Sequence, residues 1–213
     1  ILDQATFDVW LKKLHDAPLF AFDTETTGID AQQAQLVGVS FAVQPHEAAY
    51  IPLTHSYIGA PDQLDRDTVL LALKPLLEDP TKLKVGQHAK FDMNILANCA
   101  IGGDQACGIM VQGVAFDTML ESYVLDSTAT RHDMDSLALK YLGHSTTSFQ
   151  DIAGKGVKQL TFDQISLEQA GPYAAEDADV TLRLHQALHE QLAAIPSLAS
   201  VLTDIEMPLV PVL

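Results

Sequence analysis

The sequence predicts an α/β domain with a mixed central β-sheet, an antiparallel meander followed by parallel strands, flanked by α-helices. Three apolar, strand-like runs, 19–25, 36–43 and 48–53, are separated by short polar or Pro-containing links. Links of this length favour antiparallel neighbours. From residue 68 to residue 125, helix-like and strand-like segments alternate. Such alternation is typical of parallel strands joined by crossover helices.

Apolar periodicity and turn residues place the remaining elements. We expect a helix around 7–15, a helix over 68–77, a strand over 83–86, a helix over 91–98, a strand ending near Phe116, a helix through Leu125, a helix over 134–142, a polar loop through Gly156 and a long helix toward Ala194. Ser166 would cap a short lead-in turn. Pro172 would lie in the first turn of the long helix or at a kink, because proline breaks a helix interior. One domain over residues 1–213 is the simplest organisation.

Length and composition bound the class of protein. A chain of 213 residues that is 47% hydrophobic can bury a substantial core. It has no apolar run of roughly 20 residues and no signal-peptide pattern, so we expect a cytoplasmic protein without a membrane span. Cys99 and Cys107 are too few for a disulfide framework and are expected to be reduced. The lack of an initiator Met and the ending "IEMPLVPVL" are typical of a fragment of a longer chain.

The stretch "LFAFDTETTGID" ends a buried strand in two carboxylates. Side chains alternate along a strand, so Asp23 and Glu25 share the face of Leu19 and Ala21. At about 4 Å and an effective dielectric near 20, their repulsion costs about 4 kcal/mol. A divalent cation such as Mg²⁺ would relieve it. The alternatives are a salt bridge, for which the chain offers only 12 Lys and Arg residues, and a strand end that simply meets solvent.

Two helical stretches add further candidate residues. In "KVGQHAKFDMNIL" a short strand turns at Gly86 into a helix with Asp92 in its first turn, where the helix dipole alone would favour an acid. In "GPYAAEDADVTLRLH" Tyr173 and Asp177 are four residues apart, so they share a helix face. A Tyr–Asp hydrogen bond on a solvated helix is the alternative there.

In this order "DTET", "KFD" and "YAAEDAD" resemble the three motifs of the 3′→5′ exonuclease superfamily with an RNase H-like fold, in the subclass with tyrosine in its third motif. "LLEDPTKLKVGQHAKFD", "FDTMLESYVLDSTATRHDMDSLA", "IAGKGVKQLTF" and "IEMPLVPVL" extend the resemblance across nearly the whole chain, to the proofreading domain of bacterial DNA polymerase I, a family A polymerase. The resemblance implies a metal-dependent exonuclease that releases nucleoside 5′-monophosphates from single-stranded or frayed DNA 3′ ends. A polymerase domain would follow in the parent chain.

The resemblance also implies a role for each catalytic residue. Asp23 would bridge two divalent ions, Mg²⁺ with Mn²⁺ or Zn²⁺ as alternatives. Glu25 and Asp177 would complete the site of the ion that presents the attacking water. Asp92 would serve the second ion through its water shell, and Tyr173 would orient the water with its hydroxyl.

Substrate contacts are implied in the same way. Ile29 matches an apolar residue that wedges against the terminal base, and Phe149 matches an aromatic residue that contacts the penultimate base. Arg131 matches an arginine near the scissile phosphate. His88 and Phe91 lie in the second motif, where the family usually has Asn in place of His88; His still donates a hydrogen bond, so we expect a tuned activity.

Three other features have a structural interpretation. The stretch 100–113 is longer than the usual link in the family and is expected to be a surface loop of unknown role. His185 and His189 have a spacing that can bind zinc, but the chain lacks the HExxH glutamate and a solvated helix face is favoured. Asp133 and Asp135 are expected to cap a helix that begins near Met134.

Three functions compete at this point. A DNA-editing exonuclease leads, an RNA-trimming exonuclease of the same superfamily is the alternative enzyme, and a degenerate scaffold is the alternative without activity. The intact carboxylates disfavour the scaffold. The formal charge of −16 opposes extensive nucleic-acid contact, so weak, metal-dependent binding of single-stranded DNA by a monomer is expected.

Overall fold

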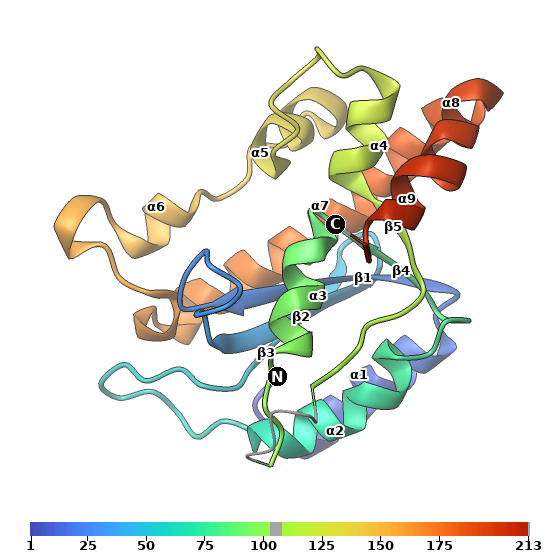
Figure 1. Cartoon of the computed structure of the whole chain (residues 1–213). Coiled ribbons are helices and arrows are strands. Elements are labelled where there is room, and N and C mark those ends of the chain that lie inside the picture. The colour runs from blue at the N-terminus through green and yellow to red at the C-terminus, as the bar shows by residue number, and fades with distance from the viewer. Residues whose placement is uncertain (103–107, 213) are drawn as a thin grey trace.

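The computed structural model describes residues 1–102 and 108–212, which surround a five-stranded sheet of order β3-β2-β1-β4-β5 (Figure 1). The strands are β1 (Leu19–Thr26), β2 (Leu36–Gln44), β3 (Glu47–Pro52), β4 (Leu83–Gly86) and β5 (Val114–Asp117). The β1–β2 and β2–β3 pairs are antiparallel, whereas the β1–β4 and β4–β5 pairs are parallel. The predicted mixed sheet is therefore confirmed, and β4 has the predicted bounds.

Helices lie on both faces of this sheet (Figure 1). Their bounds are α1 Gln4–Asp16, α2 Arg66–Leu77, α3 Ala89–Ala97, α4 Thr118–Leu125, α5 Met134–Leu137, α6 Phe149–Ala153, α7 Leu167–Ala193, α8 Pro196–Val201 and α9 Met207–Leu209. Short π-helical turns follow α5 (Ala138–Leu142) and α8 (Leu202–Glu206), and 3₁₀ turns occupy Gly156–Lys158 and Phe162–Gln164. The predicted helices at 7–15, 68–77 and 91–98 correspond to α1, α2 and α3, with ends shifted by up to three residues.

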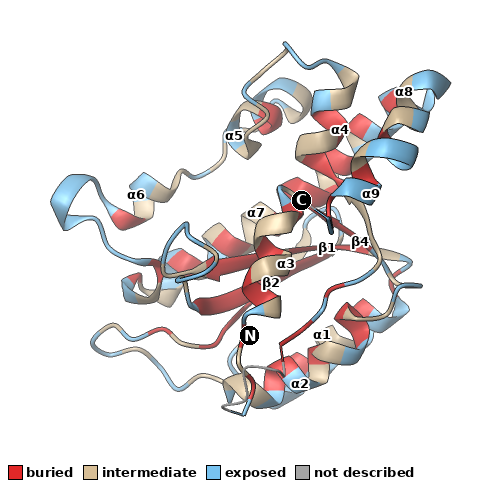
Figure 2. Ribbon diagram, in the orientation of Figure 1, coloured by how far each residue is buried: buried red, intermediate tan, exposed pale blue. Residues whose placement is uncertain are grey.

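The alternation of β1 separates two apolar layers. Phe20 and Phe22 pack into the main core with residues of α1, α2 and α3, whereas Ala21 packs against Ala178 and Leu182 of α7. The sheet is buried through most of its length (Figure 2). Small side chains on the second face let α7 lie close to the strands, so the carboxylate-bearing end of β1 faces this helix.

Aspartates begin several helices by accepting backbone hydrogen bonds. The N-cap side chains of Asp3, Asp65, Asp117 and Asp133 accept from amides in the first turns of α1, α2, α4 and α5. Such caps satisfy amides that have no partner within the helix. The prediction that Asp133 caps a helix beginning near Met134 is confirmed, whereas Asp135 is no cap: it lies in the first turn of α5 and accepts a hydrogen bond from the Thr146 hydroxyl.

Two helical predictions need correction. The stretch predicted as a polar loop through Gly156 contains α6, which Ser148 starts with a capping box that pairs it with Asp151. The long helix begins at Leu167 directly after Ser166, and Pro172 lies in its second turn. Pro172 removes only the hydrogen bond to the Glu168 carbonyl, and both residues are exposed, so water can satisfy that carbonyl.

The stretch 100–113 was expected to be a surface loop, and its described part is one only in part, because Gly102, Met110 and Gln112 are exposed while several apolar side chains are not. Ile101, Ile109 and Val111 are buried in the main core, because apolar side chains on both sides of the Gly-rich segment reach back over α2 and α3. Residues 103–107, Cys107 among them, lie outside the described residues.

Within the described ranges, no single helix is long and apolar enough to cross a membrane; α7 together with the segment Pro196–Leu209 passes that test only as a pair bent by 119°.

Candidate active site

The end of β1 carries two of the predicted carboxylates to α7. Asp23 and Glu25 continue the strand face of Ala21, and the pairing with β2 shifts register between Glu25 and Thr26. Such irregularities re-aim side chains at the ends of strands. One donor atom each from Asp23, Glu25 and Asp177 can be chosen so that all three lie within 4.8 Å of one another. The structure thus brings together residues 154 positions apart in the sequence.

Tyr173 lies one helical turn before Asp177 on the same face of α7. Tyr173 lowers the pKa of Asp177, against the larger opposing effects of burial and of the Asp23 charge. Burial first, and then the charge of Asp177, raise the pKa of the Tyr173 phenol. The hydroxyl therefore keeps its proton at neutral pH.

Asp92 approaches from the other side of β1. Its side chain is only 2% exposed, and its Oδ1 accepts a 2.9 Å hydrogen bond from the backbone N of Thr24 and a second bond from the Thr24 hydroxyl. Thr24 points away from Asp23 and Glu25 because strand side chains alternate. Thr24, the residue between the two carboxylates of β1, therefore holds Asp92 in place.

The start of α3, which carries Asp92, depends on Asp117 at the end of β5. Asp117 is buried and accepts from the backbone N of His88 at 3.1 Å and of Ala89 at 2.8 Å. It also accepts from the backbone N of Met119. His88 is the N-cap of α3 and has a left-handed backbone, with φ 56° and ψ 42°. Among side chains Asn is the one that adopts this conformation more readily, which is a backbone reason for the Asn that the resemblance implies at this position.

Ionisation is disfavoured at all four carboxyl groups. Burial raises the pKa of Asp23 to about 7. Burial and then the charge of Asp23 raise the pKa of Glu25, Asp92 and Asp177 well above the ordinary range, with Asp177 and Asp92 adding to the effect on Glu25. Without a counter-ion, this group therefore binds protons that ordinary carboxylates release.

The donor set fits divalent cations. Within residues 1–102 and 108–212, none of the four carboxylates forms an ion pair with Lys, Arg or His. Glu25 Oε1 is buried without a hydrogen-bond partner, and a buried unpaired carboxylate oxygen is costly. Oxygen-only ligands suit Mg²⁺ and Mn²⁺. The site has the chemistry of a metal site and lacks the cations that would make it a salt-bridge network.

A hollow of about 330 Å³ opens beside Glu25. Ile29 and Phe149 both line it, and Ile29 is 97% exposed. Phe149 stacks on Phe162 with ring centroids 6.4 Å apart and lies 6.4 Å from the Tyr173 ring. The hollow therefore joins apolar and aromatic surface to the carboxylates.

The other predicted substrate residues are less closely tied to the carboxylates. His88 is exposed at the start of α3, while Phe91 is half-buried and packs against the main core. Arg131 is exposed between α4 and α5, where its Nε pairs with Asp133 Oδ2 at 2.9 Å. Their contacts with a substrate stay predictions.

The interpretation of His185 as part of a solvated helix face was wrong. His185 is buried, and its Nδ1 lies 2.9 Å from Oε1 of Glu121, which is also buried. His189, one turn further, is half-exposed. Glu121 lies on α4, 64 residues earlier, so helix periodicity around the histidines could not reveal it. Thr24 and Asp117 were also missed; the strand-end position of "FD" before a helix could have indicated Asp117 as an N-cap.

Known proteins match this chain in sequence. A family model for 3′-5′ exonuclease matches residues 1–193. The chain is 78% identical over 213 residues to DNA polymerase I of Pseudomonas aeruginosa, covering 100% of this chain and 23% of that protein. It is 42% identical over 230 residues to DNA polymerase I of Rhizobium leguminosarum, covering 100% of this chain and 22% of that protein. It therefore spans less than a quarter of the length of these curated relatives.

Solved structures match the fold. The structure described as the POL domain of Pol1 from M. smegmatis, in complex with DNA primer-template and dNTP, aligns with TM-score 0.70 and 22% identity over 99% of this chain and 30% of that one. Brucella melitensis NrnC with bound Mg²⁺ aligns with TM-score 0.65 and 22% identity over 92% of this chain and 83% of that one. At these identities the likeness shows the fold alone.

The fold and the carboxylate-bearing strand end define an RNase H-like exonuclease domain. Within that class, the chain belongs to the 3′-5′ exonuclease family of the bacterial DNA polymerase I proteins. The sequence-based predictions of the fold, the family and exonuclease activity are confirmed.

Proposed function

We propose that this domain hydrolyses the terminal phosphodiester of single-stranded or frayed DNA 3′ ends, using two divalent ions, and releases nucleoside 5′-monophosphates. One observation carries the proposal. Donor atoms of Asp23, Glu25 and Asp177 converge within 4.8 Å while Glu25 Oε1 has no hydrogen-bond partner. A group of one buried and two half-buried acids with an unused oxygen is suited to cations that also contact a phosphate.

The carboxylates would divide between the two ions. Asp23, Glu25 and Asp177 would hold one ion, and Asp23 with Asp92 would serve the second. When bound, two such ions supply an activated water and charge stabilisation for an in-line displacement. Mg²⁺ is favoured by the all-oxygen donor set, with Mn²⁺ or Zn²⁺ as alternatives, and a Brucella relative of the same fold was solved with Mg²⁺.

Tyr173 would position the water that attacks the phosphorus. It lies one helical turn before Asp177 on α7, and its pKa is raised by burial and by that carboxylate. A phenol that stays protonated can donate to one oxygen and accept from the water, which fixes the water's direction. The role is one of orientation, because a phenol with a raised pKa is a poor general base at neutral pH.

The hollow beside Glu25 would receive the last two bases. Ile29 would wedge against the terminal base and Phe149 would contact the penultimate one, and both side chains line that hollow. Apolar and stacking contacts accept any base, as editing requires. His88, Phe91 and Arg131 are the proposed further contacts, Arg131 to the scissile phosphate. A mispaired end would be preferred because it costs less to melt.

The wider setting is proposed from the relatives. They are longer proteins named DNA polymerase I, so a polymerase domain of the same parent chain is the proposed partner that delivers the 3′ end. The chain itself would be a cytoplasmic monomer. With a formal charge of −16, it would bind DNA weakly and only with divalent ions.

An RNA-trimming exonuclease is the competing enzyme, and a catalytically silent scaffold is the competing protein without activity. The similarity to DNA polymerase I across the whole chain favours DNA. The intact carboxylate cluster disfavours the scaffold.

Digestion of matched 5′-labelled DNA and RNA oligonucleotides with Mg²⁺, Mn²⁺ or EDTA tests the proposal. We expect a ladder that shortens from the DNA 3′ end, stops with EDTA and is much weaker on RNA. Faster trimming of RNA would favour the alternative enzyme. No product with any metal would favour the scaffold.

A further inference from the structure

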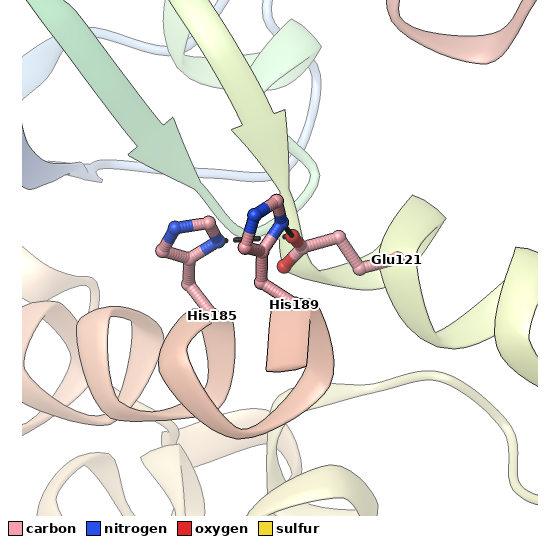
Figure 3. A group of neighbouring side chains, drawn as sticks. All are labelled: Glu121, His185 and His189. Carbon is pink, nitrogen blue, oxygen red and sulfur yellow. Dashed lines mark hydrogen bonds and ion pairs between the residues drawn. The ribbon is translucent and has the colours of Figure 1, made fainter. Parts of the chain in front are cut away.

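A second group of potential metal ligands lies away from the carboxylates, where α4 meets the C-terminal half of α7 (Figure 3). It consists of Glu121 on α4 and of His185 and His189 on α7. Asp177 and His185 are eight residues apart on the same helix, a rise of about 12 Å. The two groups are therefore separate sites on one helix.

Both histidines approach the same carboxylate oxygen. His185 Nδ1 lies 2.9 Å and His189 Nδ1 lies 3.7 Å from Glu121 Oε1, as Figure 3 shows. Ligands about 2.0–2.2 Å from a tetrahedral ion are about 3.4 Å from one another. The two measured distances lie on either side of that value, and all three donor atoms lie within 4.8 Å of one another.

A simple Glu–His ion pair leaves two features unexplained. The 3.7 Å distance from His189 is too long for a hydrogen bond, so this histidine adds nothing to the pair. Glu121 is 0% exposed, and its Oε2 is buried without a hydrogen-bond partner. In the described part of the chain, no Lys or Arg pairs with Glu121. The carboxylate thus keeps an unused oxygen that a cation would satisfy.

The surroundings hold the two rings in place and leave one side open. Phe116 of β5 packs on the His185 ring, with centroids 4.2 Å apart, and on the His189 ring, at 5.0 Å. The His189 side chain is 48% exposed while that of His185 is 9% exposed. An ion could therefore enter past His189 and keep a water as a fourth ligand.

We propose that Glu121, His185 and His189 bind a divalent transition-metal ion of the Zn²⁺ class, which ties α4 to the end of α7. Two imidazoles and one carboxylate are a recurrent protein ligand set for Zn²⁺, whereas Mg²⁺ prefers oxygen donors. The chain thus separates two metal classes by ligand type. The all-carboxylate group takes the hard ion and the His₂Glu group takes the borderline one.

An NMR titration locates the ion directly. Zn²⁺ is added to the metal-free 213-residue chain in excess Mg²⁺, which keeps the carboxylate group occupied, while the imidazole nitrogen resonances are followed. The resonances of His185 and His189 should shift together and saturate with one ion, while the other six histidines stay unmoved. Unchanged His185 and His189 resonances, or a shift of only one of them, would overturn the proposal.

Thermal unfolding in excess Mg²⁺, with and without Zn²⁺, gives a second readout that does not depend on exonuclease activity. At a free Zn²⁺ concentration about a hundred times its Kd, Tm should rise by about 5–10 °C. His189→Gln should weaken binding more than about a hundredfold, since even a partner of a metal ligand contributes about 10–100-fold, and should abolish the rise. His189 is half-exposed, so this variant should fold.

His15→Gln is the matched control, because His15 is an exposed histidine on α1. It should leave the rise intact. An equal rise in the wild-type chain and in His189→Gln would overturn the proposal, as would loss of the rise in His15→Gln.

Discussion

Thr24 of β1 holds Asp92 of α3 by two hydrogen bonds to one carboxylate oxygen, from its backbone N at 2.9 Å and from its hydroxyl. Thr24 stands between Asp23 and Glu25, whose side chains project from the opposite face of the strand. A single three-residue segment therefore supplies two carboxylates of the site and positions a third. The site depends on strand alternation as much as on the acids themselves.

Thr24→Val tests this relationship, because valine keeps the shape and removes the hydroxyl donor. A buried hydrogen bond to a carboxylate contributes about 1–3 kcal/mol, so the free energy of unfolding should fall by that amount. A loosened ligand should also slow the exonuclease by about 10–100-fold. Thr24→Ser keeps the hydroxyl and should retain most activity. Equal exonuclease rates for the Val and Ser variants would show that the Thr24 hydroxyl does not position Asp92.

The pH dependence of stability tests the carboxylate cluster. Without metal, burial holds the pKa of Asp23 at about 7, against 3.8 for an ordinary aspartate. Between about pH 4 and 7 the folded chain thus keeps a proton that the unfolded chain has released, and the free energy of unfolding falls as pH rises. Asp23→Asn should make this decline shallower and raise stability near pH 7.

Urea unfolding in EDTA at pH 5, 6 and 7 measures this decline. Asp8→Asn, at an exposed aspartate of α1, is the matched control and should follow the wild-type chain. Mg²⁺ should reverse part of the wild-type decline, because the ion binds the ionised carboxylates. A decline of the same slope in Asp23→Asn and in the wild-type chain would show that Asp23 does not retain this proton in the folded chain.

His88→Asn tests the backbone explanation for the second motif. His88 has φ 56°, in the left-handed region that Asn adopts more readily than His. We expect the free energy of unfolding to rise by about 1 kcal/mol or less, measured by denaturant titration. His15→Asn, within helix α1, should give no such gain. A destabilised His88→Asn chain would indicate that the imidazole makes a contact that outweighs backbone strain.

Ile29→Ala tests the proposed substrate hollow. The side chain is 97% exposed, so its loss should change the free energy of unfolding by less than about 0.5 kcal/mol. KM for a single-stranded DNA end should rise by about threefold or more as apolar contact with the terminal base is lost. Ile58→Ala, at another fully exposed isoleucine, should leave KM unchanged. Equal KM values for the two variants would place the 3′ end elsewhere.

The sequence predicted the parts of the fold that rest on local pattern. Apolar runs and short links were enough for β1 to β3, and β4 has the predicted bounds because Gly86 ends it sharply. Prediction from the sequence failed where only a few residues carry the pattern. Helix α6 has only five residues. In the stretch 100–113, the glycines around the buried isoleucines and valine indicated a loop and obscured the apolar pattern.

The candidate site likewise has residues that local sequence could predict and residues that it could not. Asp23, Glu25, Asp92, Tyr173 and Asp177 could be found from motif order. Thr24 could not, because its role depends on where α3 packs against β1. Glu121 and His185 meet through the packing of α4 on α7, a contact that no local periodicity describes.

The most direct test of the central claim is an anomalous difference map from crystals of this chain soaked in Mn²⁺ with a short single-stranded DNA. The account predicts two neighbouring Mn²⁺ peaks, one contacted by Asp23, Glu25 and Asp177 and the other beside Asp23 and Asp92, with the DNA 3′ end in the hollow lined by Ile29 and Phe149. A DNA 3′ end bound elsewhere, or no Mn²⁺ at these carboxylates while the DNA is degraded, would contradict it.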